Sequence, residues 1–345
     1  MAQQRDSRFE KLRILAILFI TVHHLLLFGA DVCGYLTTYT PDSKGYAGIF
    51  TNSVAVTGVS LFVMITGWFG VRRVWRPFFR LIITCAVFGL VAFLLAQSQR
   101  AVPSPPWSQW WESAKFTNWW FIIHYLMLLL VAPLLERGLA SIDRKTMEYI
   151  LLALLVFNLV FGFAWGYVNA SGYNVVHFIL LYVLARYMRL FPDAPVNSFI
   201  RRFALPLIIV CAATMGILFL AEPEWWQPKH TPMVWNYNCP LVILESMAIF
   251  SLFTQSQSHK VAESQSRPIL FVARFVLGVY LLQSAPVLVP LRNAFGHLAY
   301  DWAGYAGLLF ALLVIAVVCW TVSCVVMTVL RPLLSKLSTG ENVKQ

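Results

Sequence analysis

Two ionisable side chains share helical spacing in the first apolar stretch of the sequence, where Arg13 precedes His24 by eleven residues. At 100° per residue they fall about 20° from perfect alignment on one helix face, about 16 Å apart along the axis. His23 falls about 80° off that line. We therefore expect His24 to share a channel with Arg13, and imidazole there suits a general base. The alternative is that Arg13 extends to the membrane surface and His24 makes a structural hydrogen bond.

A second feature is a group of arginines that follows the apolar stretch "GVSLFVMITGWFGV". Guanidinium groups bind phosphate through two parallel hydrogen bonds, although the same charges also set topology or contact lipid phosphate. We expect three of the four to bind phosphate together with Arg13, whereas Arg72 lies on a different azimuth. These three are Arg73, Arg76 and Arg80. A phosphate-bearing head held here, with a long thin arm reaching His24, describes a coenzyme A thioester.

The elements that position these residues are membrane helices. Hydrophobic residues make up 59% of the 345 and charged residues 12%, whereas a soluble domain is about half apolar and a quarter charged. Apolar stretches near twenty residues recur along the chain, and each is long enough to cross about 30 Å of hydrocarbon. We predict one all-α, polytopic integral-membrane domain over residues 1–345 with about ten transmembrane helices. The predicted helices are about 11–29, 53–71, 77–96, 118–136, 147–166, 174–190, 203–220, 239–256, 269–287 and 303–330.

Charge predicts the orientation of these helices. With ten spans and the N-terminus inside, 21 of the 26 lysines and arginines fall on the inner side, as the positive-inside rule requires. The five outer ones are Lys44, Arg100, Lys115, Lys229 and Arg292. We therefore predict that both termini are cytoplasmic in a cell-membrane protein, and that the net charge of +11 encodes orientation and not nucleic-acid binding. No A-x-A-like site follows Phe28, so we expect a retained helix and not a cleaved signal peptide.

Further polar and aromatic groups at membrane depth are candidates for the site. Buried carboxylates in spans are rare, so Glu245 is a candidate to orient His24 or to bind an acceptor hydroxyl. His124 is a weaker candidate beside the tryptophan pair Trp119 and Trp120. Outer tryptophans form either an interfacial belt or a platform for a sugar ring. The six cysteines show no metal-ligand spacing, and we predict neither a metal nor a resident cofactor.

The sequence resembles acyltransferase family 3, the integral-membrane O-acyltransferases of bacteria and their relatives, over most of its length. "RFEKLRILAILFITVHH" is similar to the family's first helix, and "MITGWF" to its second. "NWWFIIHYLMLLLVAPLLE", "HFILLYVLARYMRLF" and "ARFVLGVYLLQSAPVL" are similar to later family segments, with two departures. Ala185 replaces a glycine, and Gln283 stands where many members have histidine.

This resemblance implies acyl transfer from cytoplasmic acyl-CoA, acetyl-CoA above all, to a hydroxyl of a glycan or lipid-linked sugar. His24 is then a general base or a covalent acyl carrier, and the sequence does not choose between them. Acceptor-binding residues are expected to be Trp119, Trp120, His124, Tyr125 and Tyr280. Two other classes stay open: a proton-coupled secondary transporter, and a non-enzymatic partner in glycan export.

Overall fold

The computed structural model describes residues 6–32, 43–71, 73–221, 233–254 and 263–339, and all regular structure in these ranges is helical. The predicted all-α class is therefore confirmed for this part of the chain. The α-helices are α1 (Ser7–Phe28), α2 (Ser43–Ala55), α3 (Gly58–Phe69), α4 (Trp75–Ser98), α5 (Trp110–Ser113), α6 (Trp120–Ala140), α7 (Arg144–Phe157), α8 (Val175–Leu190), α9 (Pro195–Arg202), α10 (Ala204–Ala221), α11 (Pro240–Thr254), α12 (Glu263–Ala273), α13 (Val276–Gln283) and α14 (Val289–Thr339). The 3-10 and π segments are η1 (Trp107–Gln109), η2 (Phe116–Asn118), η3 (Asn158–Ala164), η4 (Ala170–Gly172) and η6 (Met233–Trp235).

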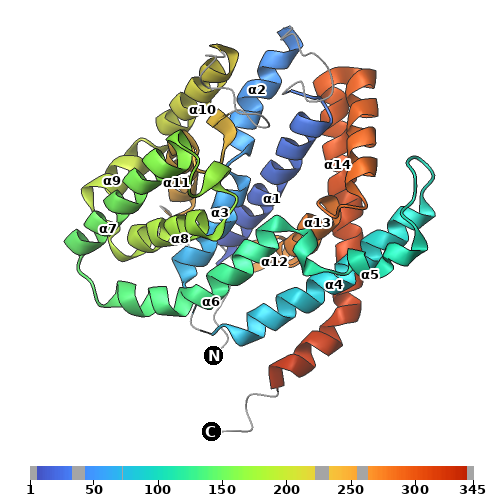
Figure 1. Ribbon diagram of the computed structural model, residues 1–345, viewed down its shortest axis with the longest axis horizontal. Coiled ribbons are helices and arrows are strands. Elements are labelled where there is room, and N and C mark those ends of the chain that lie inside the picture. Colours follow the sequence, from blue (N-terminus) through green and yellow to red (C-terminus); the bar gives the residue numbers. More distant parts are fainter. Residues whose placement is uncertain (1–5, 33–42, 72, 222–232, 255–262, 340–345) are drawn as a thin grey trace.

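Helix α1 lies in the middle of the bundle (Figure 1). The Asp6 side chain caps it by accepting the backbone N–H of Arg8 at 3.0 Å, so α1 starts at Ser7, a few residues before the predicted start. It contacts α2, α3, α11, α12, α13 and α14. Leu12, Ala16 and Ile17 are fully buried. A helix packed on so many sides can carry a polar group only where the protein supplies a partner or a cavity.

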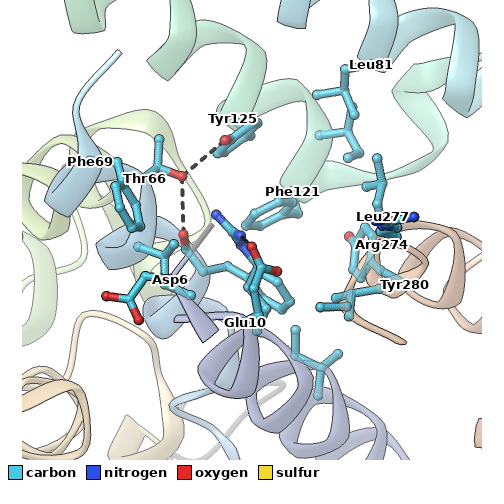
Figure 2. A pocket seen from close by; sticks show the side chains of 17 residues that line it. Asp6, Glu10, Thr66, Phe69, Leu81, Phe121, Tyr125, Arg274, Leu277 and Tyr280 are labelled. Carbon is cyan, nitrogen blue, oxygen red and sulfur yellow. Dashed lines mark hydrogen bonds and ion pairs between the residues drawn. The ribbon is translucent and has the colours of Figure 1, made fainter. Parts of the chain in front are cut away.

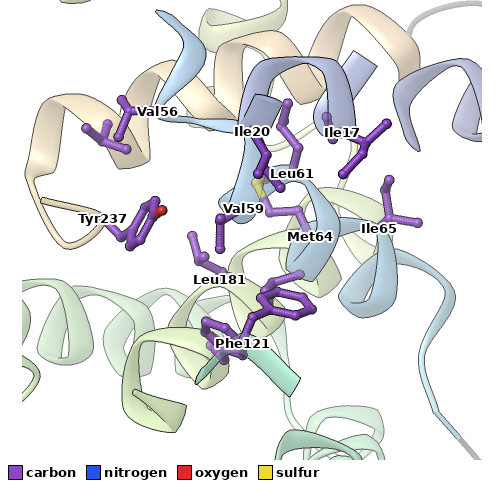
Figure 3. Close-up of a cluster of buried hydrophobic side chains, with 14 of the residues drawn as sticks. Ile17, Ile20, Val56, Val59, Leu61, Met64, Ile65, Phe121, Leu181 and Tyr237 are labelled. Atoms are coloured by element: carbon purple, nitrogen blue, oxygen red, sulfur yellow. The ribbon is translucent and has the colours of Figure 1, made fainter. Parts of the chain in front are cut away.

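Helix α3 packs tightly on both α1 and α8 because glycines stand at the two contacts. A Cβ on Gly58 would lie 2.7 Å from the backbone oxygen of Ala16 on α1. A Cβ on Gly67 would lie 2.5 Å from the backbone oxygen of Tyr182 on α8 and 2.8 Å from its Cα. Figure 3 shows the apolar cluster that fills the space between these helices, including Ile20 of α1 and Met64 of α3.

Within the described part of the chain, seven helical stretches are long and apolar enough to cross a bilayer, and the number rises to eight if α8 and α9, which meet at a 93° bend, form one span. The predictions at 77–96, 118–136 and 203–220 match α4, α6 and α10 within a few residues. The span predicted at 53–71 is made by α2 and α3 together, as one apolar stretch over Gly45–Phe69. The multi-pass membrane architecture is thus confirmed.

Two predicted spans coincide with shorter helices. Residues 239–256 correspond to α11, which has 15 residues, and 255 and 256 lie outside the described ranges. Residues 269–287 are divided between α12 and α13, which are separated by a break at Arg274 and Phe275. The finer count of about ten spans therefore stays a prediction, and so does the cytoplasmic location of the termini.

Helix α14 is two helices joined by a reversal, and its first arm was missed in the sequence. Gly304 adopts φ 56° and ψ −133° at the break. A Cβ on Gly307 would lie 1.7 Å from the backbone oxygen of Ala299. In a straight helix these two residues would be about 12 Å apart along the axis, so the chain must fold back between them. Residues 288–302 fall between the helices predicted at 269–287 and 303–330, and the predicted topology places this connection, with Arg292, on the outer side. In Figure 1, α14 ends at the same end of the molecule at which α1 begins.

Because α3 approaches α8 closely at Gly67, even the substitution of this glycine by alanine should destabilise the protein. In Gly67→Ala the added methyl clashes with backbone atoms of Tyr182. Backbone atoms within a helix cannot move aside as a flexible side chain can. We expect the free energy of unfolding to fall by about 1–3 kcal/mol, measured as a lower thermal-unfolding midpoint in detergent. Gly138→Ala on α6 is the matched control, because a Cβ there has nothing within 4 Å. Equal midpoints for the two variants would contradict the packing.

Candidate functional site

A pocket of ≈460 Å³ lies along one face of α1. This helix contributes Asp6, Glu10, Arg13 and Ile20, whose spacings of four, three and seven residues form one stripe. The other walls come from α3, α4, α6, α13 and the end of α12 (Figure 2). Their lining residues are Phe62, Ile65, Thr66, Phe69, Leu81, Phe121, Ile122, Tyr125, Ala273, Arg274, Val276, Leu277 and Tyr280. The volume lies within the range of about 300–1,000 Å³ that is usual for small-molecule sites.

The pocket is charged at one end and apolar beyond it. Arg274 is exposed and Asp6 partly so, whereas Ile20 and Tyr280 are buried, so the pocket opens where α1 begins. Arg13 forms an ion pair with Glu10, whose carboxylate is buried. Burial acts to raise the pKa of Asp6, but hydrogen bonds and charge from Arg8 outweigh it and leave this pKa below its ordinary value. At the open end, the carboxylates of Asp6 and Glu10 are therefore paired with arginines of α1. Arg274 adds a further arginine from the opposite wall of the pocket.

The closed end of the pocket lies one helical turn from His24. Ile20 precedes His24 by four residues on the same face of α1, which is about 6 Å along the axis. Tyr280 precedes Gln283 by three residues on α13, and the Gln283 side chain is within interaction range of the His24 ring. The predicted alignment of Arg13 with His24 is thus realised on α1: Arg13 lines the open part and His24 follows the closed end.

His24 has a cationic partner that the sequence did not reveal. Nη1 of Arg292 lies 3.1 Å from Nδ1 of His24 and donates to the backbone oxygen of Gln283 at 2.9 Å. Its Nε and Nη2 both bind Oδ1 of Asn293. His23 points elsewhere, with Nδ1 at 2.7 Å from Oδ1 of Asn52. Arg292, which we had counted among the outer charges, is therefore buried beside His24 and not at the surface.

The expected acceptor residues are divided among three places, two of which hold all but Trp119. Tyr125 and Tyr280 line the pocket, and the Tyr125 hydroxyl lies 3.0 Å from Oγ1 of Thr66 (Figure 2). Trp120 packs against Tyr237 and Tyr173, with ring centroids 5.6 and 4.5 Å away, and His124 adjoins the same aromatic group.

Trp119 has a different environment from its neighbour Trp120. It is 1% exposed, and its indole N–H donates to the backbone oxygen of Leu281 at 3.1 Å. Its single polar atom is therefore used inside the protein. The two adjacent tryptophans therefore have different surroundings: Trp119 is buried in the protein, and Trp120 belongs to the aromatic group with Tyr173 and Tyr237.

The arginines that follow α3 lie outside the pocket lining. Arg73, Arg76 and Arg80 are exposed, and Arg80 immediately precedes the lining residue Leu81. Arg72 lies outside the described residues. Arg73 precedes α4, and Arg76 and Arg80 lie in its first two turns, so none of the three forms part of the pocket wall.

Arg274 is a pocket residue that we had counted only as an inner-side charge. The sequence held a signal for it, because Arg274 and Arg292 are the only charged residues between Pro268 and Asn293. An isolated charge in an apolar stretch usually faces the protein interior or a cavity.

Glu245 lies on α11 and is fully buried. Neither carboxylate oxygen has a hydrogen-bond partner among the described residues, and the groups within electrostatic range are the thiols of Cys211 and Cys239. The expected contact between Glu245 and His24 is not made in this arrangement.

Residues 7–324 match a family model described as an acyltransferase domain. No curated protein and no solved structure matches the chain. The matched range contains every pocket residue except Asp6, together with His24 and Arg292. The family assignment therefore covers the whole candidate site apart from one residue at its open end.

The openness of the pocket can be tested by cysteine reactivity. In a background whose six native cysteines are replaced by alanine, we expect Leu277→Cys to react with a water-soluble maleimide, because Leu277 lines the pocket. Leu281→Cys, one turn further along α13, should not react, because position 281 is 0% exposed. Similar labelling of the two cysteines, measured by mass shift under native conditions, would argue against a water-accessible pocket.

Proposed function

The chain belongs to acyltransferase family 3, and from that premise we propose that it is an O-acyltransferase of the cell membrane. It transfers an acyl group, acetyl above all, from cytoplasmic acyl-CoA to a hydroxyl of a glycan or lipid-linked sugar. The observation that supports this most is the stripe on α1, which leads from Arg13 in the open pocket to His24 one turn beyond its closed end.

The donor enters the pocket from the end at which α1 begins. Arg274 and Arg13 hold its phosphates through charge-assisted hydrogen bonds, and Arg73, Arg76 and Arg80 add positive charge at the rim. The apolar wall at Phe121 and Leu277 suits a thin pantetheine arm, which points the thioester towards His24.

His24 then acts on the hydroxyl of the acceptor. It takes the hydroxyl proton as the oxygen attacks the thioester carbonyl, so that a C–O bond forms and the C–S bond breaks. The thiolate receives the proton from the imidazolium and leaves as free coenzyme A thiol. In the covalent variant an imidazole nitrogen attacks first, releases the thiol, and passes the acyl group to the acceptor in a second step.

The acceptor is proposed to approach from the side of the aromatic group around Trp120, which lies on α6 beyond Tyr125. Trp120 is half-buried and stacks on the buried ring of Tyr237, so the surface that it can offer to a sugar ring is the part of the indole that Tyr237 leaves uncovered. Tyr125 and Tyr280, which we expected to bind the acceptor, line the donor pocket, and we now assign them to the thioester. Glu245 stays a candidate without a contact that supports it.

The role of His24 predicts a specific loss of activity. His24→Ala should lower the rate of thiol release from acetyl-CoA by at least about 100-fold, the usual contribution of general acid–base catalysis. His23→Ala is the matched control: it removes the hydrogen bond to Asn52 and some stability, but leaves the base in place. Thiol release is followed with and without extracted surface glycan, and thermal unfolding verifies that both variants are folded.

Three outcomes of that assay differ in meaning. Loss in His24→Ala alone supports the proposal. Glycan-independent release in the unchanged chain favours the acyl-histidine route or slow hydrolysis. In the third outcome, neither folded protein releases thiol from any of several acyl-CoAs or binds coenzyme A. That result would rule out acyl-CoA as the donor and favour a proton-coupled transporter or a non-enzymatic partner in glycan export.

The donor pocket predicts which arginine matters for acyl-CoA affinity. Arg274→Gln should raise KM for acetyl-CoA roughly 10- to 150-fold with little change in kcat, because a hydrogen bond between charged groups is lost. Arg267→Gln on α12 makes the same change in net charge at an exposed position outside the pocket lining. Equal KM values for the two variants would show that the effect is nonspecific charge and not phosphate binding in the pocket.

A further inference from the structure

A group of buried polar side chains lies beyond the closed end of the pocket, and its charge is not balanced. Arg292 is 8% exposed. Its hydrogen-bond acceptors are all neutral: the His24 ring, the Asn293 side chain and the Gln283 backbone oxygen. No carboxylate of the described residues forms an ion pair with it. An arginine buried at membrane depth without a counter-charge is costly unless a binding partner supplies one.

The second observation concerns Gln283. Gln283 is 3% exposed, and among the described residues neither its amide oxygen nor its amide nitrogen makes a hydrogen bond of regular geometry. It nevertheless lies within interaction range of the His24 ring, next to the guanidinium that its own backbone oxygen binds. The His24 ring presents one nitrogen to this amide, because Arg292 holds the other, so at least one of the two amide atoms is left for a polar ligand beside His24.

The contact between Arg292 and His24 also decides which nitrogen of the imidazole carries a proton. Arginine has donors and no acceptor, so Nδ1 of His24 must accept from Nη1 and cannot be protonated. The proton of the neutral ring is then on Nε2. In this arrangement both nitrogens are committed, one as acceptor from Arg292 and one as an N–H donor. His24 therefore cannot take a proton from a hydroxyl until Arg292 moves off Nδ1.

We propose that Arg292 binds an anionic group, a carboxylate or phosphate, on the second substrate, and that this binding frees Nδ1 of His24 to act as the base. The acceptor is thus an acidic glycan or lipid-linked sugar whose anionic group lies near the attacked hydroxyl. Gln283 binds the same molecule through the amide group that the His24 ring leaves free. When the anion pairs with Arg292, Nδ1 takes the hydroxyl proton as the C–O bond forms, the C–S bond of the thioester breaks, and the leaving thiolate takes the proton from the imidazolium.

The inference rests on the proposed function, and its first test does not need turnover. The full chain is labelled with ¹⁵N-histidine in lipid nanodiscs, and the His24 signals are assigned with His24→Gln. We expect the Nε2–H tautomer for His24. Sodium glucuronate should shift it at constant ionic strength, and sodium chloride should not. Arg292→Lys should keep part of the shift and Arg292→Gln should abolish it. An Nδ1–H tautomer, or the same shift in Arg292→Gln, would overturn the proposal.

The second test uses matched acceptors. With acetyl-CoA, thiol release should be at least 10-fold faster with glucuronate than with glucose, and Arg292→Gln should remove that ratio. A faster rate with succinyl-CoA and glucose would show instead that the acyl group carries the anion, and would overturn the assignment to the acceptor. Equal rates for charged and neutral acceptors in the unchanged chain would overturn the anion site itself.

The two proposals fail differently. If no acyl-CoA releases thiol with any acceptor, the proposed function fails, and the tautomer and its response to glucuronate still decide whether Arg292 binds anions next to His24. If thiol release depends on His24 but does not change in Arg292→Gln and Arg292→Lys, the acyltransferase proposal is supported and the anion site is excluded. Thermal unfolding shows in each case whether the Arg292 variants are folded.

Discussion

A polar side chain on a helix that is packed on nearly every side must find its partner inside the protein, and this constraint shapes the centre of the bundle. Helix α1 satisfies it by pairing Arg13 with Glu10, His23 with Asn52 and His24 with Arg292. Each partner comes from a defined place: the same helix, α2 and the first arm of α14. The polar residues of α1 therefore make contacts that hold α2 and α14 against it, although α14 is far from it in the sequence.

The close contacts of α3 explain why a pocket exists beside this helix. Glycines let α3 approach the backbones of α1 and α8, and the next large side chains on α3, Phe62 and Ile65, form one wall of the cavity. The opposite wall changes direction at Arg274, where α12 ends and α13 begins. That break places a charged side chain at the open end and an apolar wall above it, which is the polarity that a phosphate-bearing thioester requires.

The sequence predicted those parts of the site that depend on one helix. Eleven residues of regular helix were enough to align Arg13 with His24, and apolar length was enough to locate α4, α6 and α10. Arg292 could not be placed in this way, because its role depends on the reversal at Gly304 and on the packing of α14 against α1. Likewise, Tyr125 and Trp120 are close in sequence, but the rotation of α6 directs them to different surroundings.

The amide side chain of Gln283 bears on how this chain handles its proton. A histidine in that place would put a second imidazole beside His24, able to accept and release a proton. An amide cannot, although it can donate and accept hydrogen bonds at the same time. With Gln283 in that place, proton acceptance near the closed end falls to His24, and the group that controls the availability of Nδ1 is Arg292. The amide therefore makes the arginine contact more consequential, because it cannot replace a ring whose acceptor is occupied, and the neighbouring His23 ring is bound to Asn52.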